Sequence, residues 1–330
     1  MPDSARQLPL FANDHPSVPE KRAARLHPTW SFSRRSLLER CPRAYYLQFY
    51  GSNARSARGE PLKEELRRLK TLVSRHERAG KLLHLGASTY FRHARRGDLW
   101  EAEQLVEWIT DIFREDCAYS RTHPRGGGEV AGREHQPALL WEYFDGHPDA
   151  DRLCEEAAAR LADGVRRFAT DPGFEEFRLN GTLIGALVEH RFTLAGMPFP
   201  AAGVVDLAYV SAGKVTVVDW KLGEYDGCGD GSLQLATYAL WATEYYRCAP
   251  GDVRVCEVHP AYGEVVEHAA TTSLLAAARA RITQDVERMG LLHPYGRDAV
   301  GGAFTKRLAP AICNLCRYKS VCLDPEEFRP

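Results

Sequence analysis

Two aspartates and a lysine are the residues most able to do chemistry in this sequence. Asp219 and Lys221 stand two positions apart in KVTVVDWKLG, and we expect Asp206 to end the preceding strand, GVVDLAYV. Strand alternation would place Asp219 and Lys221 on one face, and a hairpin would bring Asp206 beside them. Two converging carboxylates favour Mg2+ or Mn2+, and an ammonium group stabilises charge on a phosphate. Taken singly, these residues are also typical of a strand-end cap and a surface pair.

Four cysteines form a second set. Cys313, Cys316 and Cys322 follow the spacing C-x2-C-x5-C near the C-terminus, and Cys41 lies near the N-terminus. Thiolates are soft ligands that suit zinc or an iron-sulfur cluster. Pro42 and the five-residue gap favour an iron-sulfur cluster, which would join the two ends of the fold. The alternative is a local zinc site at the C-terminus, with Cys41 as a buried thiol.

Periodicity predicts the elements that would position these residues. From Thr182 the period is two, which predicts three consecutive strands with turns at Ala195-Gly196 and Ala212-Gly213. Further along the chain, the spacing predicts a helix, two strands and a long helix. The seven segments, in order, are residues 182–194, 199–210, 214–223, 231–248, 253–260, 263–269 and 272–290.

The N-terminal half is predicted to be helical. A first helix, with Ser33 as its N-cap, would carry Cys41 facing inward, and a second would run from Pro61 to Phe91. Two more helices are expected at 100–118 and 150–169. The predicted organisation is a tail (1–30) and one domain (31–330), which comprises a helical insertion (about 86–180), a catalytic sheet (about 182–270) and a cysteine tail (310–325).

In this order, the landmarks resemble the PD-(D/E)XK nuclease superfamily in its RecB-like branch. The motif residues are Gly80 and His84 in GKLLHLGASTY, Asp206, Asp219-Trp220-Lys221, and Gln234 and Tyr238 in QLATYA. The cysteines resemble the 4Fe-4S site of the AddB nuclease domain, iron-sulfur CRISPR-associated nucleases and exonuclease V. The resemblance implies an α/β fold, a restriction-endonuclease-like mixed sheet flanked by helices.

The resemblance also implies a role for each matching residue. His84, Asp206 and Asp219 would bind the metal together with the Trp220 carbonyl, and Lys221 would be the catalytic lysine. Gln234 and Tyr238, four apart on one helix face, would position the DNA backbone or the metal-site loop. Glu189, one strand before Asp206, is a candidate for a second metal or a water. Taken singly, each of these residues has an ordinary structural interpretation: His84 as a core histidine, Gln234 and Tyr238 as helix residues, and Glu189 as an outward-facing strand residue.

The tail contains a separate signal. Residues 7–11, Gln7, Leu8, Pro9, Leu10 and Phe11, resemble the short peptide by which bacterial replication and repair proteins bind the sliding clamp. An extended segment of this kind offers a glutamine for a polar contact and two apolar side chains for a pocket. Pro9 departs from the usual Ser or Asp at the third position.

Composition and charge limit the function classes. The chain has 330 residues, of which 44% are hydrophobic, and no apolar run long enough for a membrane helix. Residues 21–81 contain 16 Lys and Arg against 5 Asp and Glu, which leaves +11 there and −12 on the rest. Such a segment suits a polyanion, although local Glu–Arg pairs on a solvated helix face would give the same composition. With nine cysteines, an odd number, and no signal peptide, we expect a cytoplasmic protein with unpaired thiols at Cys117, Cys154, Cys228, Cys248 and Cys256.

We therefore expect a Mg2+- or Mn2+-dependent deoxyribonuclease, an exonuclease rather than an endonuclease, acting on single strands or DNA ends in repair, recombination or defence. A helicase or a defence-system protein is a possible partner. The alternative is an inactive iron-sulfur module that binds DNA and recruits partners, and a redox-responsive regulator is a third hypothesis. The complete set of site residues favours the enzyme.

Overall fold

The computed structural model describes residues 28–53, 61–126, 137–224, 231–298 and 300–322. Two features of the sequence lie outside the described residues: the clamp-like peptide at 7–11 and Cys228. Within the described ranges, no helix is long and apolar enough to cross a membrane.

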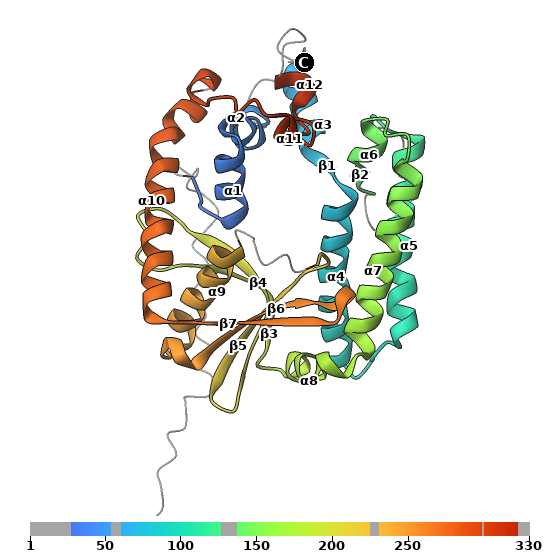
Figure 1. Ribbon diagram of the computed structural model, residues 1–330, viewed down its shortest axis with the longest axis vertical. Helices are drawn as coiled ribbons and strands as arrows, with labels where there is room; N and C mark the ends of the chain where they lie inside the picture. Colours follow the sequence, from blue (N-terminus) through green and yellow to red (C-terminus); the bar gives the residue numbers. More distant parts are fainter. Residues whose placement is uncertain (1–27, 54–60, 127–136, 225–230, 299, 323–330) are drawn as a thin grey trace, which may run out of the picture.

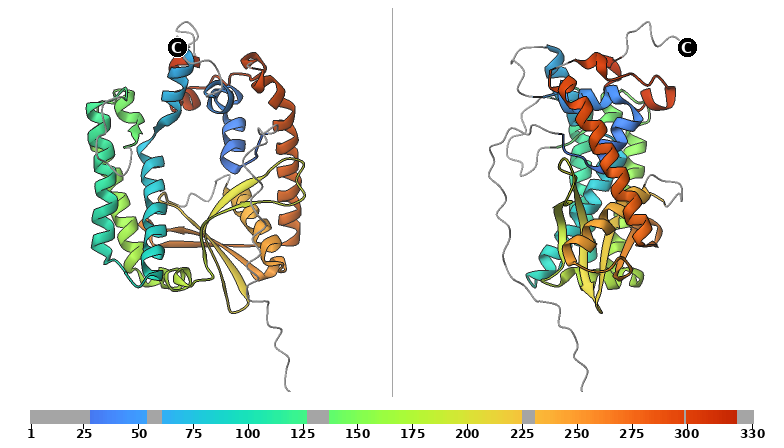
Figure 2. Two further views of the ribbon diagram at one scale, coloured as in Figure 1. Left: turned by 180° about the vertical axis from the view of Figure 1, so that it is seen from behind. Right: turned by 90° about the vertical axis from the view of Figure 1, so that its left-hand side faces the viewer.

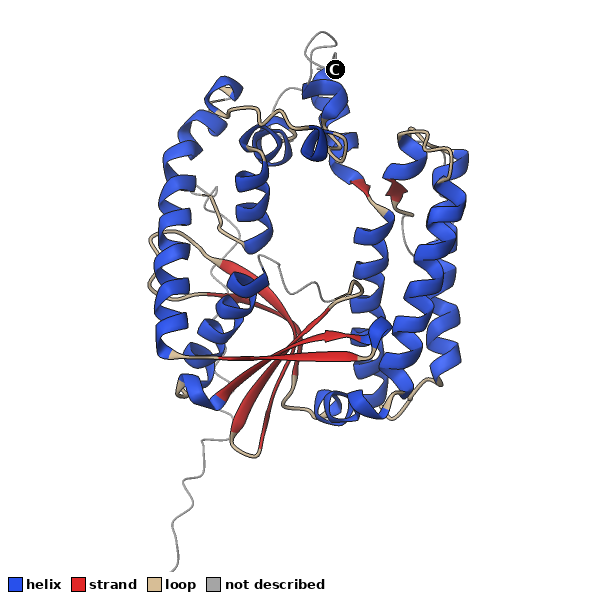
Figure 3. Cartoon of the chain, in the orientation of Figure 1, coloured by secondary structure: helices blue, strands red, loops and turns tan. Residues whose placement is uncertain are grey.

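A mixed five-stranded sheet is formed by the second half of the chain (Figure 3). The strands stand in chain order, and neighbours are antiparallel except β5 and β6, which are parallel. A parallel pair needs a crossover connection, and the helix α9 lies between these two strands in the chain. The strands are β3 (Leu187–Thr193), β4 (Ala202–Ser211), β5 (Lys214–Trp220), β6 (Val253–His259) and β7 (Glu264–Ala269).

Most of the remaining described residues are helical. The α-helices are α1 (Phe32–Arg40), α2 (Pro42–Tyr46), α3 (Pro61–Thr71), α4 (Arg75–Arg95), α5 (Ala102–Thr122), α6 (Trp141–Phe144), α7 (Ala150–Thr170), α8 (Glu175–Thr182), α9 (Gly231–Tyr246), α10 (Thr272–Arg297), α11 (Pro310–Cys313) and α12 (Lys319–Cys322). Short π- or 3-10 turns are η1 (Leu47–Gly51), η2 (Pro172–Phe174), η3 (Pro250–Asp252), η4 (Pro260–Tyr262) and η5 (Gly301–Ala303). A small parallel pair is formed by β1 (Leu72–Val73) and β2 (Leu139–Leu140).

Two hydrophobic cores hold helices against the two faces of the sheet. Val215 and Val217 of β5 pack into the core formed with α9 and α10. Their neighbours on the strand, Val218 and Trp220, pack into the core formed with α4, α5 and α7. In Figure 1 these two helical groups stand on opposite sides of the sheet. The strand's alternating side chains therefore connect both layers of the protein.

A third core forms what we call the cap, which consists of α1, α2, α3, α11 and α12. Its buried members include Cys41, Leu47, Leu69 and Tyr318, which come from both ends of the described chain. The cap lies above the sheet, between α10 and α4, in Figures 1 and 2. Apolar packing therefore joins the N- and C-terminal parts of the described chain.

The three-strand meander and its two turns are confirmed by the antiparallel order of β3, β4 and β5. Gly196, Ala212 and Gly213 have φ of 68°, 50° and 77°, the left-handed values that such turns require. The strand at 253–259, the strand at 264–269 and the helices on either side of them were also predicted correctly.

Several local predictions were wrong. The first helix is capped by Ser31, whose hydroxyl accepts from the Arg34 amide, and not by Ser33. Cys41 is not on a helix: it has an extended backbone, φ −162° and ψ 109°, between α1 and α2. Pro42 explains this break, because the residue before a proline avoids the helical conformation. The stretch expected as one helix from Pro61 is divided at β1, which pairs with β2.

Two further errors concern strand boundaries. The strand expected from Thr182 begins only at Leu187, because Thr182 ends α8, in which Gly181 packs on the ring of Phe91. Asp206 does not end its strand, because β4 continues to Ser211. Tertiary packing set both boundaries: α8 is held by α4, and β4 is paired on both edges.

Candidate active site

The register of the sheet brings the two predicted aspartates together. Leu207 pairs with Val218 in the antiparallel pair β4–β5, so Asp206, one residue before Leu207, and Asp219, one residue after Val218, lie opposite each other. The Trp220 amide donates a hydrogen bond of 2.8 Å to Asp206 Oδ2. Both carboxylates are buried, with 5% and 1% of their residue surface exposed. Buried carboxylates are rare unless they are paired or bind a metal.

Glu189 extends this row of carboxylates to the edge strand β3. The residues on either side of it, Val188 and His190, pair with β4, which places Glu189 opposite Asp206. Its φ is 49°, a left-handed conformation that is uncommon for a residue other than glycine. A strained backbone of this kind costs about 1–3 kcal/mol and is most often found at functional sites. Glu189 was only a secondary candidate in the sequence.

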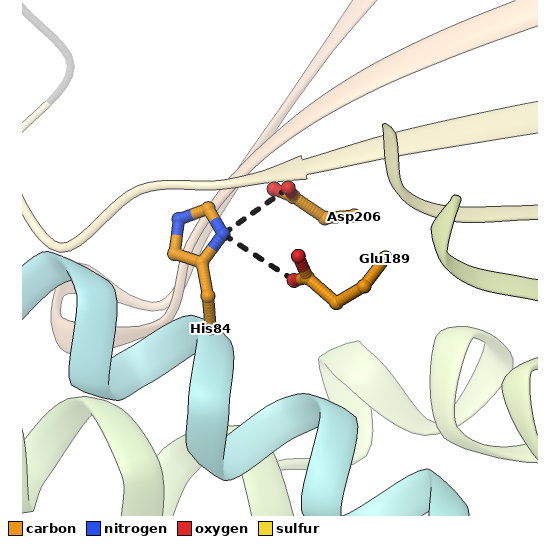
Figure 4. Close-up of side chains that lie close together, drawn as sticks. All are labelled: His84, Glu189 and Asp206. Carbon is orange, nitrogen blue, oxygen red and sulfur yellow. Dashed lines mark ion pairs between the residues drawn. The ribbon is translucent and has the colours of Figure 1, made fainter. Parts of the chain in front are cut away.

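His84 reaches the same carboxylates from the helix α4 (Figure 4). Its Nδ1 lies 3.1 Å from Asp206 Oδ1 and 3.8 Å from Glu189 Oε1. Burial disfavours the imidazolium, but Asp206 and Glu189 stabilise it more strongly and raise the pKa of His84 to about 10. Without a metal ion, the protonated histidine therefore neutralises part of the carboxylate charge itself.

Lys221, Gln234 and Tyr238 surround the other aspartate. Lys221 Nζ lies 2.7 Å from Asp219 Oδ2, and it donates to Gln234 Oε1 at 3.3 Å. The amide nitrogen of Gln234 donates to Asp219 Oδ1 at 3.3 Å and to the Tyr238 hydroxyl at 2.7 Å. A glutamine suits this position because its amide presents an acceptor to the ammonium and a donor to the carboxylate.

The electrostatics of this group follow from burial and close pairing. Burial raises the pKa of Asp219 to about 6, although the Lys221 ammonium opposes that shift. Burial disfavours the charged lysine, but Asp219 outweighs it and raises the pKa of Lys221. Lys221 is therefore a stable ammonium at neutral pH, suited to stabilising negative charge and not to acting as a base.

The donor set fits a divalent cation. His84, Glu189 and Asp206 each present a ligand atom, and these atoms all lie within 4.8 Å of one another. One imidazole and two carboxylates suit Mn2+ or Mg2+ better than a soft metal. Asp219 adjoins this set, but its carboxylate is turned toward Lys221 and Gln234.

The cysteines predicted to bind a cluster also come together. Cys41, Cys313, Cys316 and Cys322 line one cavity in the cap, together with Lys306 and other residues. Burial and the neighbouring thiols raise the pKa of Cys316 and Cys322. In the described part of the chain, no three cysteine sulfurs lie within 4.8 Å of one another. The eight cysteines in that part, which also include Cys117, Cys154, Cys248 and Cys256, form no disulfide.

The basic N-terminal segment is partly neutralised within the fold. Arg35 pairs with Glu39 and Asp285, and Arg68 pairs with Glu65. Further ion pairs join Arg75 to Glu142, Arg78 to Asp116 and Lys81 to Glu77. Ion pairs within the fold therefore neutralise part of the positive charge that the composition alone would make available for binding a polyanion.

Comparison with known protein families agrees with this geometry. The family model of the PD-(D/E)XK nuclease superfamily matches residues 29–323. The chain belongs to the PD-(D/E)XK nuclease superfamily. A search of curated proteins finds no match. Membership indicates a nuclease-like function, and the mixed sheet flanked by helices fits the superfamily's fold.

Sequence reasoning missed two residues next to the superfamily site. Glu257 pairs in register with Asp219 on the neighbouring strand, and His259 follows it on the same face. The alternation of these two residues in VRVCEVHP was the available signal. It went unused because the partner of β5 across a parallel pair cannot be identified without the fold.

Proposed function

We propose that this PD-(D/E)XK protein is a metal-dependent deoxyribonuclease that hydrolyses phosphodiester bonds in single-stranded DNA or at DNA ends, as an exonuclease. The single observation that carries the proposal is the convergence of His84, Asp206 and Asp219 beside Lys221. His84 comes from α4, more than a hundred residues before the β4–β5 hairpin that carries the two aspartates, and Lys221 is held as an ammonium by Asp219. Repair, recombination or defence is the proposed setting.

His84, Asp206 and Asp219 would hold the divalent cation, together with the Trp220 carbonyl, and Glu189 would serve a second ion or a water. When bound, the cation supplies charge neutralisation and activation of a water for attack on phosphorus. The chain's own residues do the rest.

Lys221 donates to a phosphate oxygen as negative charge develops there. Gln234 orients the ion pair between the ammonium and the Asp219 carboxylate, because its amide bonds to both. Tyr238 fixes the amide in turn. Burial raises the pKa of Tyr238 well above its usual value, so its hydroxyl remains neutral.

The test compares the wild type with Asp219→Ala on DNA labelled at either end, single-stranded and duplex, in Mg2+ and Mn2+. We expect metal-dependent products from the wild type, with the labels giving polarity, and a loss of cleavage of at least ~100-fold in the variant. A wild type that binds DNA but releases no product would favour the inactive binding module instead.

We also propose that the cap holds a 4Fe-4S cluster on Cys41, Cys313, Cys316 and Cys322. The four cysteines line one cavity, which supports a shared metal group. Pro42 after Cys41 and the spacing C-x2-C-x5-C favour an iron-sulfur cluster over a zinc site. When bound, the cluster supplies a covalent link between the two ends of the fold.

The cluster proposal is tested by iron, sulfide and zinc analysis after anaerobic purification. We expect about four iron atoms per chain and brown absorption, and we expect Cys313→Ser to lose both and to unfold at a lower temperature. One equivalent of zinc and no iron in the wild type would contradict the cluster.

The cap is also the part of the surface that we propose meets the DNA backbone. Residues 300–322 contain four basic residues and no acidic one. Of these, Lys306, Arg307 and Lys319 line the cysteine cavity. Phosphate contacts of this kind make DNA affinity fall steeply with salt.

A bacterial sliding clamp is a proposed partner through residues 7–11, and the support for it is the sequence QLPLF alone. Deleting residues 1–20 should abolish clamp binding in calorimetry without changing cleavage of free DNA. Equal clamp affinity with and without the deletion, or no affinity in the full chain, would contradict this proposal.

A further inference from the structure

The chain leaves the sheet immediately after the lysine of the proposed active site. β5 ends at Trp220, and Lys221 makes the last ladder bond, from its amide to the Val258 carbonyl at 2.8 Å. Two residues later, the Gly223 carbonyl lies 2.5 Å from Nδ1 of His259 on β6. This contact ties the segment beyond the lysine back to the sheet.

His259 is itself held by a second residue of the same strand. Glu257 stands two positions earlier, so both side chains lie on one face, and its Oε1 is 3.3 Å from His259 Nε2. The His259 side chain is 2% exposed and that of Glu257 13%. On β7, His268 approaches the other oxygen of Glu257 at 3.8 Å. Glu257 also pairs in register with Asp219, which places this group beside the active-site row.

The chemistry of the partners fixes the protons on His259. A backbone carbonyl can only accept, so Nδ1 donates to Gly223. Nε2 faces a carboxylate, which is also an acceptor, so the favoured form carries protons on both nitrogens. The pKa of His259 is raised, which agrees with this form: burial disfavours the charged ring, but Glu257 and the Gly223 carbonyl outweigh burial.

We propose that His259, oriented by Glu257, is a positioning residue for Lys221. By tying Gly223 to β6, it fixes the path of the chain that carries the lysine and hence the place of the ammonium. Two short contacts depend on that place: Lys221 Nζ with Asp219 at 2.7 Å and with Gln234 at 3.3 Å. This inference rests on the proposed nuclease function, because it assigns His259 to the same catalytic event.

Three substitutions at His259 separate positioning from mere packing. His259→Asn keeps an amide donor near the position of Nδ1, so it can still bond to Gly223. His259→Gln places its amide near Nε2 instead, and His259→Ala removes both donors. The matched control is His268→Ala, which alters the same neighbourhood of Glu257 without touching the tether.

The measured quantities are kcat and KM for DNA cleavage, DNA affinity in EDTA and the unfolding temperature. We expect His259→Ala and His259→Gln to lower kcat ~10- to 100-fold with KM and DNA affinity nearly unchanged, because a shift of about 1 Å in a catalytic group costs this much. His259→Asn should recover most of kcat, and His268→Ala should match the wild type.

The inference is overturned if His259→Ala and His259→Gln cleave like the wild type, or if His259→Asn is no better than His259→Ala at equal unfolding temperature. Glu257→Gln keeps the side chain's size and decides the matter if the alanine variant does not fold: its kcat should fall, and an unchanged kcat overturns the role of Glu257. An inactive wild type would refute the nuclease function instead, so the two failures are distinguishable.

Discussion

Metal binding at the proposed site should release a proton from His84. In the metal-free protein the histidine lies 3.1 Å from Asp206 Oδ1 and 3.8 Å from Glu189 Oε1. Although burial acts in the opposite direction, these carboxylates raise its pKa to about 10. A ring nitrogen can bind a metal only through its lone pair, so the bound proton must leave. Metal and proton therefore compete for one site.

The pKa of His84 sets the free energy of removing its proton and the pH dependence of metal affinity. At pH 7, three units below the pKa of about 10, removing the proton costs about 4 kcal/mol, which the attraction between metal and carboxylates must offset. The sign is fixed: the protonated form dominates below pH 10, so metal affinity should rise as pH rises. We expect ~10-fold tighter Mn2+ binding per pH unit from 7 to 8.5 and release of about one proton per ion. Asp219, whose pKa is about 6, is already ionised in this range and adds no slope.

The assay is calorimetric titration of Mn2+ into the DNA-free protein in buffers of different ionisation enthalpy. His84→Asn is the control, because an amide oxygen can bind the ion without a proton to lose. It should bind Mn2+ with little pH dependence and release no proton. Proton release near zero in the wild type, or undiminished release in His84→Asn, would refute the assignment of His84 as a metal ligand.

Two further predictions concern stability and are measured by denaturant unfolding of the metal-free protein. Gly80→Ala should stabilise α4 by about 0.5–1 kcal/mol, because no atom of a neighbouring element lies within 4 Å of the added methyl group. Gly181→Ala should instead destabilise the protein by about 1–3 kcal/mol, because its Cβ would stand 2.2 Å from the Phe91 ring. Equal changes in the free energy of unfolding for the two variants would contradict this packing. Arg78→Met should destabilise by roughly 3–5 kcal/mol, because it leaves the buried Asp116 carboxylate without the guanidinium at 2.6 Å; a loss under about 1 kcal/mol would show that the Ala138 amide alone satisfies that carboxylate.

The catalytic sheet was predictable because its sequence is locally consistent. The alternating apolar residues of β4 and β5 and the left-handed turn at Ala212-Gly213 define a hairpin, and a hairpin fixes which residues face each other. The proximity of Asp206 and Asp219 could therefore be predicted from the sequence. The error in placing Asp206 at a strand end did not matter, since register and not strand length sets the pairing.

Other parts of the site depend on contacts between distant segments. The strained backbone of Glu189 and the tether from His259 to Gly223 have no local signature, because each depends on a neighbouring strand. The position of His84 depends on how α4 packs on the sheet. For His84 the resemblance to a family, and not periodicity, supplied the prediction, whereas the role of His259 was not predicted.

In the cap, one feature was predicted from the sequence and another was missed. The spacing of Cys313 and Cys316 predicted a metal site, and the structure places both in one cavity with Cys41. The break at Pro42, which gives Cys41 an extended backbone, could have been predicted from the proline itself.

The most direct test of the central claim is single-turnover cleavage of labelled single-stranded DNA in Mn2+ by the wild type and Lys221→Met. Lys221 is not a proposed metal ligand, and methionine keeps most of its length. The proposed mechanism predicts that Lys221→Met still binds Mn2+ and DNA but cleaves at least ~100-fold more slowly, because charge developing on the phosphate is no longer stabilised. Cleavage at the wild-type rate by Lys221→Met would contradict it.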